Sequence, residues 1–321
     1  MRIVTPLRVL SAAAAIALFA GCSGRTSLAV SPIAELSLYV RTGTHIIGHY
    51  ACPAMGSIVY VSDATNSIIN AYTGEFAGQA PCGQIFSRSL GRPIGLYVQS
   101  ASHDLYVANE FGHDILVFQR GQTTAYNSYV DPTGQFPVDV TVAGDGTVIA
   151  VDSDCNILTW IGGPSGGRFV GSFPITNCAL GSFVSVNNSG TVYFDDFVGS
   201  KLHGALGKLS CPAGACGPQT QIKGVSLHSP QGLAFDALGD LLLTDAHAGS
   251  ADTFELPNPK PSAFPLAGKP QGMAINARNN CWFIADGNRG AAEYLYPSGV
   301  LVGTVPVNPS NGDAAGIAID P

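Results

Sequence analysis

One string in the sequence has the pattern of a serine nucleophile: residues 163–167 read Gly-Pro-Ser-Gly-Gly and match G-x-S-x-G around Ser165. Such a serine is active when it lies on a sharp turn from a strand into a helix, within reach of a histidine base. Here the string lies in a glycine-rich turn between two apolar runs, and the seven histidines are scattered without paired spacing. The pattern therefore predicts a loop and no catalytic serine.

Metal binding is a second candidate chemistry, and it rests on Asp139. This residue places a carboxylate where most copies of a repeated segment have glycine. One carboxylate supported by amide oxygens can hold calcium weakly, so Asp139 is a candidate metal ligand and calcium a candidate cofactor. Residues at the starts of the repeated first strands are predicted to form one ligand-binding face: Arg92, Asp139, Gln231, Gln271 and Asp313.

Cysteines offer a third chemistry, and their spacing favours disulfides. Seven of the eight follow an N-terminal segment that resembles an export signal, and exported chains reach an oxidising compartment in which cysteines pair. The short-loop pairings are Cys52 with Cys82, Cys155 with Cys178, and Cys211 with Cys216. Cys281 is left over at the start of an apolar strand, where a buried free thiol is expected. A zinc site at residues 211–216 lacks a second ligand pair at suitable spacing.

A sequence repeat supplies the elements that position these residues. Each copy has a Pro-x-Gly-like start, an apolar run, a tight turn and a second apolar run that ends in Asp or Asn; residues 230–245 are the fullest copy. The anchors follow at steps of 40 to 49 residues: Gly95, Asp139, Phe183, Gly232, Gly272 and Gly316. An Ile- or Val-rich third run and a weaker fourth run complete the copies. Four strands in about 45 residues are typical of a β-propeller blade.

The two ends of the repeat array predict a closed ring. The first copy begins with a second strand, residues 57–63, whereas the chain stops at a first strand, residues 315–321. Pairing these two strands completes a sixth blade and removes two open strand edges. The sequence therefore predicts an all-β, six-bladed β-propeller of four-stranded blades, closed by pairing of the N- and C-terminal strands.

The repeat resembles a known family. The pattern P-x-G-x-A-x-D, a turn, a second strand ending in Asp and an Ile/Val-rich third strand is similar to the NHL repeat, and residues 62–72 match it most fully. The related gluconolactonase and senescence-marker family has the same type of six-bladed ring. Its lactonases hold a divalent cation on the ring axis, which implies a metal-dependent hydrolase as an alternative function. This chain lacks the Glu-Gly-Pro string of that family.

The aspartates that close the second strands have a simpler expected role. A short carboxylate can accept hydrogen bonds from the backbone amides of the turn that it opens. We therefore expect Asp63, Asp152, Asp245 and Asp286 to stabilise turns and not to bind ligands.

Residues 1–21 have the features of a secretory signal peptide. Arg2 and Arg8 mark a short basic region, and residues 9–19 are apolar and alanine-rich. The ending Leu-Phe-Ala-Gly-Cys resembles the lipobox of bacterial lipoproteins, which implies lipidation of Cys22. We expect residues 22–35 to form a lipidated N-terminus and tether, and residues 36–321 the propeller. The protein would then be an exported lipoprotein, anchored to a membrane of the bacterial cell envelope.

The charge of the chain bears on its partners. The formal net charge is −7, and it becomes −9 when Arg2 and Arg8 leave with the signal peptide. No basic stripe is available to neutralise phosphates, so nucleic acid is not an expected partner.

Three functions remain open at this point. The favoured one is binding of an envelope protein, peptide or glycan on the predicted face. The alternatives are a divalent-metal-dependent, lactonase-like hydrolase that uses Asp139, and a purely structural envelope component. A tightly bound axial metal would favour the hydrolase, whereas a co-purifying envelope partner would favour binding.

Overall fold

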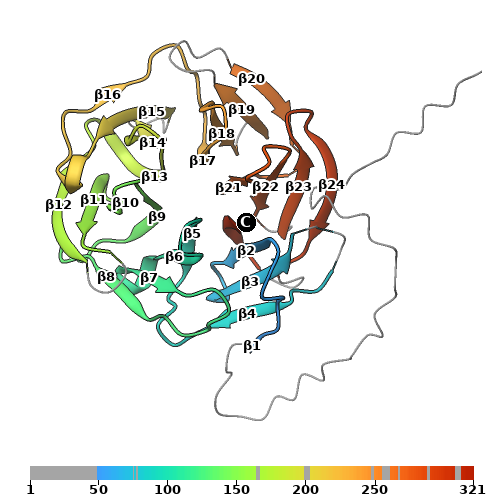
Figure 1. The fold of residues 1–321 in the computed structure, drawn as a ribbon. Helices are drawn as coiled ribbons and strands as arrows, with labels where there is room; N and C mark the ends of the chain where they lie inside the picture. The colour runs from blue at the N-terminus through green and yellow to red at the C-terminus, as the bar shows by residue number, and fades with distance from the viewer. Residues whose placement is uncertain are drawn as a thin grey trace, which may run out of the picture.

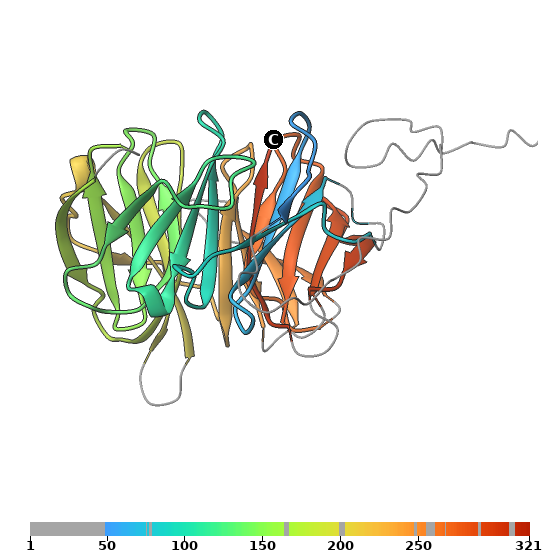
Figure 2. The same cartoon turned by 90° about the horizontal axis from the view of Figure 1, so that it is seen from below.

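The chain folds into a six-bladed β-propeller, as its repeat predicts. The computed structural model describes residues 49–74, 76, 79–163, 167–198, 203–246, 249–254, 261–266, 268–287, 290–307 and 312–321. Within these residues six antiparallel sheets surround a central axis (Figure 1). In side view the strands run between two opposite faces where the turns gather (Figure 2). No described helix is long and apolar enough to cross a membrane. The predicted signal peptide, Cys22, the tether and Ser165 lie outside the described residues.

Five of the blades have four strands in chain order. Two of these are β5 (Pro93–Gln99), β6 (Asp104–Asn109), β7 (Asp114–Phe118), β8 (Asn127–Val130), and β9 (Pro137–Val142), β10 (Val148–Asp152), β11 (Asn156–Ile161), β12 (Arg168–Pro174). The other three are β13 (Cys178–Val186), β14 (Thr191–Val198), β15 (His203–Ser210), β16 (Thr220–Gln221); β17 (Pro230–Phe235), β18 (Leu241–Asp245), β19 (Ser250–Phe254), β20 (Pro261–Pro265); and β21 (Met273–Ile275), β22 (Cys281–Asp286), β23 (Gly290–Leu295), β24 (Val300–Val305). The second strands β6, β10, β18 and β22 are buried at every residue, because sheets cover both of their faces.

The sixth blade is built from both ends of the propeller. Its inner strand is β25 (Ala314–Asp320), which pairs antiparallel with β2 (Ile58–Asp63), with Val59 opposite Ile319. The predicted closure is therefore confirmed. The sheet continues through β3 (Ile68–Thr73) and β4 (Gly83–Phe86) to β1 (His49–Tyr50), a fifth strand that the repeat did not predict.

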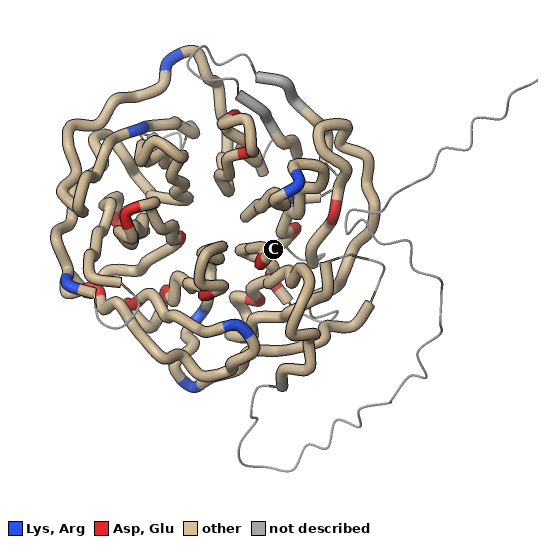
Figure 3. The backbone as a smooth tube through the Cα atoms, viewed as in Figure 1, with Lys and Arg blue, Asp and Glu red and all other residues tan. Residues whose placement is uncertain are grey.

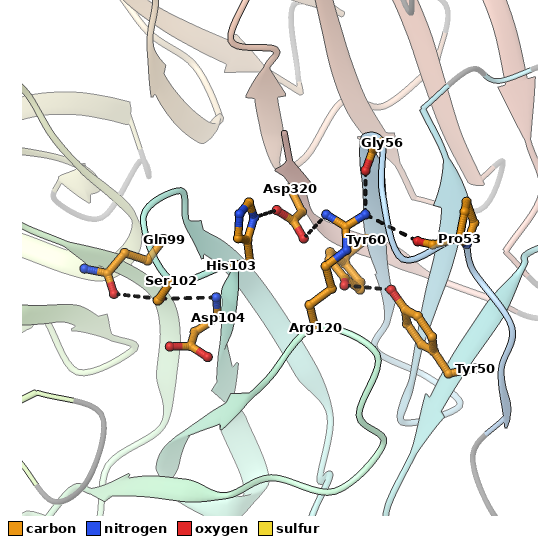
Figure 4. Close-up of polar contacts among 10 residues, drawn as sticks. All are labelled: Tyr50, Pro53, Gly56, Tyr60, Gln99, Ser102, His103, Asp104, Arg120 and Asp320. Carbon is orange, nitrogen blue, oxygen red and sulfur yellow. Dashed lines mark hydrogen bonds and ion pairs between the residues drawn. The ribbon is translucent and has the colours of Figure 1, made fainter.

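A polar cluster at the C-terminus, here called the closing clasp, links this blade to the next one (Figure 4). The Asp320 carboxylate is fully buried and accepts a hydrogen bond from Arg120 Nη1 at 2.8 Å. His103 Nδ1 contacts the other carboxylate oxygen of Asp320. Arg120 Nη2 donates to the carbonyl oxygen of Gly56, so one arginine joins the C-terminal strand to the segment that leads into β2.

Glycines at the repeat anchors allow neighbouring inner strands to pack closely around the axis. A Cβ on Gly272 would lie 2.9 Å from the Cα of Gly316, and a Cβ on Gly316 would lie 3.1 Å from the Cα of Gly95. The inner strands are also bulged here: Pro93 pairs with Asn109 and Leu96 with Val107, so an extra residue is inserted around Gly95. The repeated glycine is thus a packing requirement of the ring.

The three predicted disulfides are present: Cys52–Cys82, Cys155–Cys178 and Cys211–Cys216. Disulfides persist in oxidising compartments, which indicates an extracytoplasmic protein. The prediction of a free thiol at Cys281 is wrong, because Cys281 is disulfide-bonded. Cys281 is buried as predicted, at the start of β22.

Two of the strand-ending aspartates, Asp63 and Asp152, hold the turn that they open, as expected, whereas Asp245 and Asp286 hold the segment that leads into the inner strand of their blade. Asp245 accepts hydrogen bonds from the amides of His228 and Ser229, at 2.9 and 3.0 Å. Asp152 accepts from the amide of Asn156 at 2.8 Å. Asp63 and Asp286 likewise accept from the amides of Asn66 and Lys269.

Candidate functional site

The five residues of the predicted face lie at different depths. Arg92 and Asp313 precede their inner strands and are partly exposed. Gln231 and Gln271 stand immediately before the anchors Gly232 and Gly272, and the side chains of Gln271 and Asp313 both approach Gly287. Asp139 is itself at an anchor position, opposite Val151 in the sheet, and lies at the axis with 7% of its surface exposed. Asp139 is therefore buried, whereas the other four residues are partly exposed.

The Asp139 carboxyl is buried between neighbouring inner strands. Its Oδ2 accepts a hydrogen bond from the amide of Val184 on β13 at 3.0 Å. Burial raises the pKa of Asp139 to about 8, because a charged carboxylate would lose its hydration. At neutral pH the group is therefore mostly protonated.

A second axial acid, Asp195 on β14, was not singled out from the sequence. It occupies the position of Ser62 and Thr244 in other blades, whose hydroxyls donate to the carbonyl oxygens of Ile94 and Gln271, at 2.8 and 2.6 Å. Burial, with a smaller contribution from nearby Asp139, raises the pKa of Asp195 well above its usual value. Asp195 Oδ1 accepts from the amide of Phe183 at 2.8 Å. Many Asp and Glu residues lie along the inner part of the ring, whereas most Lys and Arg lie farther out (Figure 3).

These axial acids do not fit a calcium site. Calcium takes six to eight oxygen ligands, several of them charged carboxylates. The other anchors are glycines and Phe183, and no group of three or more His, Cys, Asp or Glu side chains among the described residues is placed to hold a metal ion. The central cavity, of about 440 Å³, is lined largely by apolar side chains and backbone of the inner strands.

An exposed aromatic side chain, Phe111, lies in the turn between β6 and β7, beside Arg92 of the predicted face. Asn109 ends β6 and holds the segment before β5: its Oδ1 accepts from the amide of Gly91 at 2.6 Å, and its Nδ2 donates to the carbonyl oxygen of Ser89 at 2.8 Å. The short 3-10 turn η1 (Glu110–Gly112) then projects Phe111, which is 59% exposed. Its amide donates to the carbonyl oxygen of Gly91 at 2.7 Å, so the turn is held against the start of β5.

Phe111 and three further side chains form what we call the aromatic platform: Arg92 and Phe136, which contact Phe111, and His113, which contacts Phe136. The Phe136 ring, 37% exposed, lies edge-on to Phe111 at 6.2 Å, and the His113 ring lies 4.8 Å from Phe136. The Arg92 guanidinium stands 5.5 Å from the centre of the Phe111 ring and pairs with Glu110. His113 Nδ1 contacts the carbonyl oxygen of Gln135 at 2.8 Å, which fixes the imidazole. The platform thus joins the β5–β8 blade to the β9–β12 blade, and Arg92 is its one member among the predicted face residues.

Comparison with known proteins defines the fold class. No family model and no curated protein matches the sequence. Among solved structures, a chain of a nidogen/laminin complex is similar with a TM-score of 0.64 and 14% identity, over 82% of this chain and 98% of that chain. A protein of unknown function from Bacteroides caccae has a TM-score of 0.60 and 12% identity, over 83% and 99%. Virginiamycin B lyase from Staphylococcus aureus has a TM-score of 0.56 and 12% identity, over 79% and 83%. At these identities the similarity establishes the six-bladed β-propeller fold.

Proposed function

We propose that this protein is an extracytoplasmic binding module that holds a protein, peptide or glycan of the cell envelope on its aromatic platform. The platform carries the proposal, because Phe111 is 59% exposed and yet fixed by backbone hydrogen bonds from its turn. Aromatic and arginine side chains are enriched in the centres of binding surfaces, and side chains that are ordered in advance lose less entropy on binding. The nidogen/laminin neighbour is consistent with this proposal, since it is a propeller in a complex between proteins.

A hydrolase or lyase is the second candidate, since virginiamycin B lyase has the same fold. A catalytically inactive His-to-Ala variant of that lyase has been solved with quinupristin. In the present chain, the described residues that line the central cavity include no histidine. Together with the poor fit of the axial acids to calcium, this favours binding over catalysis.

Truncating the aromatic platform should weaken partner binding without affecting the fold. The double variant Phe111→Ala, Phe136→Ala removes two partly exposed rings, so its melting temperature should stay within a few degrees of wild type. Loss of two aromatic contacts at a binding centre should weaken retention of solubilised envelope components on the immobilised protein at least about tenfold.

The matched control is Leu238→Ala. Leu238 is 82% exposed, in the turn between β17 and β18 at the opposite end of its blade. It should retain the same components as wild type. Equal retention by the double variant and by Leu238→Ala would place the binding surface elsewhere.

We further propose that lipidated Cys22 anchors the propeller to the envelope membrane. Cys22→Ala should move the protein from the membrane to the soluble fraction or block its maturation. Lipidation places the Cys22 sulfur in a thioether, so a lipidated chain cannot use Cys22 in a disulfide. The intact mass of the mature protein, with peptide mapping, separates these two states, and a Cys22 found in a disulfide would contradict the anchor.

A further inference from the structure

A second cavity, away from the axis and from the aromatic platform, lies in the β13–β16 blade. Its volume is about 280 Å³, and it is lined by β14, β15, the region of β16 and the segment between β12 and β13, which supplies Ile175 and Asn177. Small residues create the space: in the sheet, Asp196 of β14 stands opposite Ala205 and Phe194 stands opposite Gly207. The ring of Phe194 fills the position of a side chain at Gly207, so the hollow remains beside Asp196.

Asp196 occupies the position of the turn-capping aspartates but does not cap a turn. At Asp63 and Asp152 the chain turns after this residue, and the carboxylate accepts an amide of that turn. Here β14 continues to Val198, and Phe197 pairs with Gly204 across the β14–β15 ladder. The backbone after Asp196 therefore belongs to the β14–β15 ladder and forms no turn that the carboxylate could cap. Asp196 Oδ1 is buried without a hydrogen-bond partner. The residue as a whole is 4% exposed.

A second acceptor faces the same cavity. The side-chain oxygen of Gln219 is also buried without a partner, and Gln219 lines the cavity together with Asp196. Buried acceptors without donors are unusual, and a buried carboxylate without a cation is more so. Burial raises the pKa of Asp196 to about 6, so at pH 7.5 the group is still mostly ionised. The site therefore offers a negative charge and two free acceptor atoms, and no described residue donates a hydrogen bond to either of them.

We infer that this cavity binds the ammonium or guanidinium group of a small organic cation, with Asp196 as the counter-ion and Gln219 as the second acceptor. The walls favour an organic cation over a metal ion: Ile175, Phe194 and Leu206 are apolar, and Asp196 is the one carboxylate among the described residues that line the space. Calcium would need several charged oxygens. The cavity volume is near the lower end of ligand sites, roughly 300–1000 Å³, and suits a small head group. This inference does not depend on the proposed binding role of the aromatic platform.

The test is a titration of the full mature protein with ethylammonium or methylguanidinium chloride at pH 7.5, followed by calorimetry and thermal melting. Sodium chloride at equal ionic strength, the neutral N-methylurea and calcium chloride serve as comparison ligands. We expect saturable binding of the organic cations, with a melting temperature that rises with their concentration. The neutral analogue should not bind. Amides of N-acetyl-lysine and N-acetyl-arginine distinguish a free amine from a side chain of a partner: a preference for these amides assigns the site to a peptide.

Two variants test the assigned residues. Asp196→Asn should weaken cation binding at least tenfold and, without ligand, should leave the melting temperature unchanged or raise it, because an uncompensated buried charge is removed. Ala205→Leu should fill the hollow and block binding while keeping Asp196. The control is Asp154→Asn, which removes the same charge from an exposed position and should bind as wild type does. Undiminished cation binding by Asp196→Asn would overturn the inference, and so would saturable calcium binding that Asp196→Asn abolishes.

Discussion

A chain that lacks residues 315–321 is expected to lose its cooperative unfolding transition and to aggregate. These residues are nearly all of β25, the inner strand of the closing blade, where Ile317 is 3% exposed and stands opposite Val61. Burial of a large apolar side chain contributes about 1.5–3 kcal/mol, against a total stability of about 5–15 kcal/mol. The deletion also exposes the backbone edges of β2 and of the adjacent inner strands, which can pair with other chains.

A single substitution in the closing clasp should also destabilise the closing blade, by less than the deletion does. Asp320→Ala leaves the Arg120 guanidinium without its carboxylate, and the Arg120 side chain is 16% exposed. Breaking one partner of a buried ion pair costs about 3–5 kcal/mol, and the value here should lie at or below the lower end because Arg120 keeps its bond to the carbonyl oxygen of Gly56.

Calorimetry and urea denaturation give the melting temperature and the free energy of unfolding of the truncated chain and of Asp320→Ala. Deletion of Pro321 alone is the matched control, because this residue follows β25 and is exposed. A protein lacking residues 315–321 that melted as one transition at the wild-type temperature would show that β25 is not needed to close the ring.

The fold was predictable because each copy of the repeat contains the strands and turns of one blade. Buried second strands read as unbroken apolar runs, such as residues 105–108, since sheets cover both faces. The first copy lacks its first strand and the last copy has only a first strand, so pairing the two strands completes the sixth blade. β1 was not predictable, because two residues at the outer edge carry no period. Cys281 was misjudged because no other cysteine lies near it in the sequence, and spacing indicates only short-loop pairings.

The candidate site was less predictable because it depends on register and on neighbouring blades. Asp139 aligns with glycines in the sequence, but the direction of its carboxyl follows from the bulge in β9 and the nearby amide of Val184. Phe111 and Phe136 are separated by 25 positions and meet because consecutive blades are adjacent. The doublet Asp195-Asp196, where the other copies have one acid or none, was the available signal for the acids of the β13–β16 blade.

The last prediction concerns pH: the folded protein should lose stability as the pH rises from about 5 to 8. The folded-state pKa of Asp139 is about 8, whereas an unfolded Asp titrates near 3.9. Between these values the folded state holds a proton that the unfolded state has released, so the free energy of unfolding falls as pH rises, by about 1.4 kcal/mol per pH unit for one such group. For Asp139 this loss ends above about pH 8, where both states are ionised. Asp195 acts in the same direction, because its pKa is also raised by burial.

Asp139→Asn isolates the contribution of one group. Asparagine cannot ionise, its side-chain oxygen can accept from the amide of Val184, and its NH₂ can occupy the place of the carboxyl hydroxyl. We therefore expect the variant to be more stable than wild type at pH 8, and its slope between pH 5 and 8 to be lower by about one proton. Urea unfolding at pH 5, 6, 7 and 8 gives both quantities, with the exposed Asp154→Asn as control. If Asp139→Asn kept the wild-type slope, Asp139 would have to be ionised in the folded protein, because a group charged in both states adds nothing to the slope.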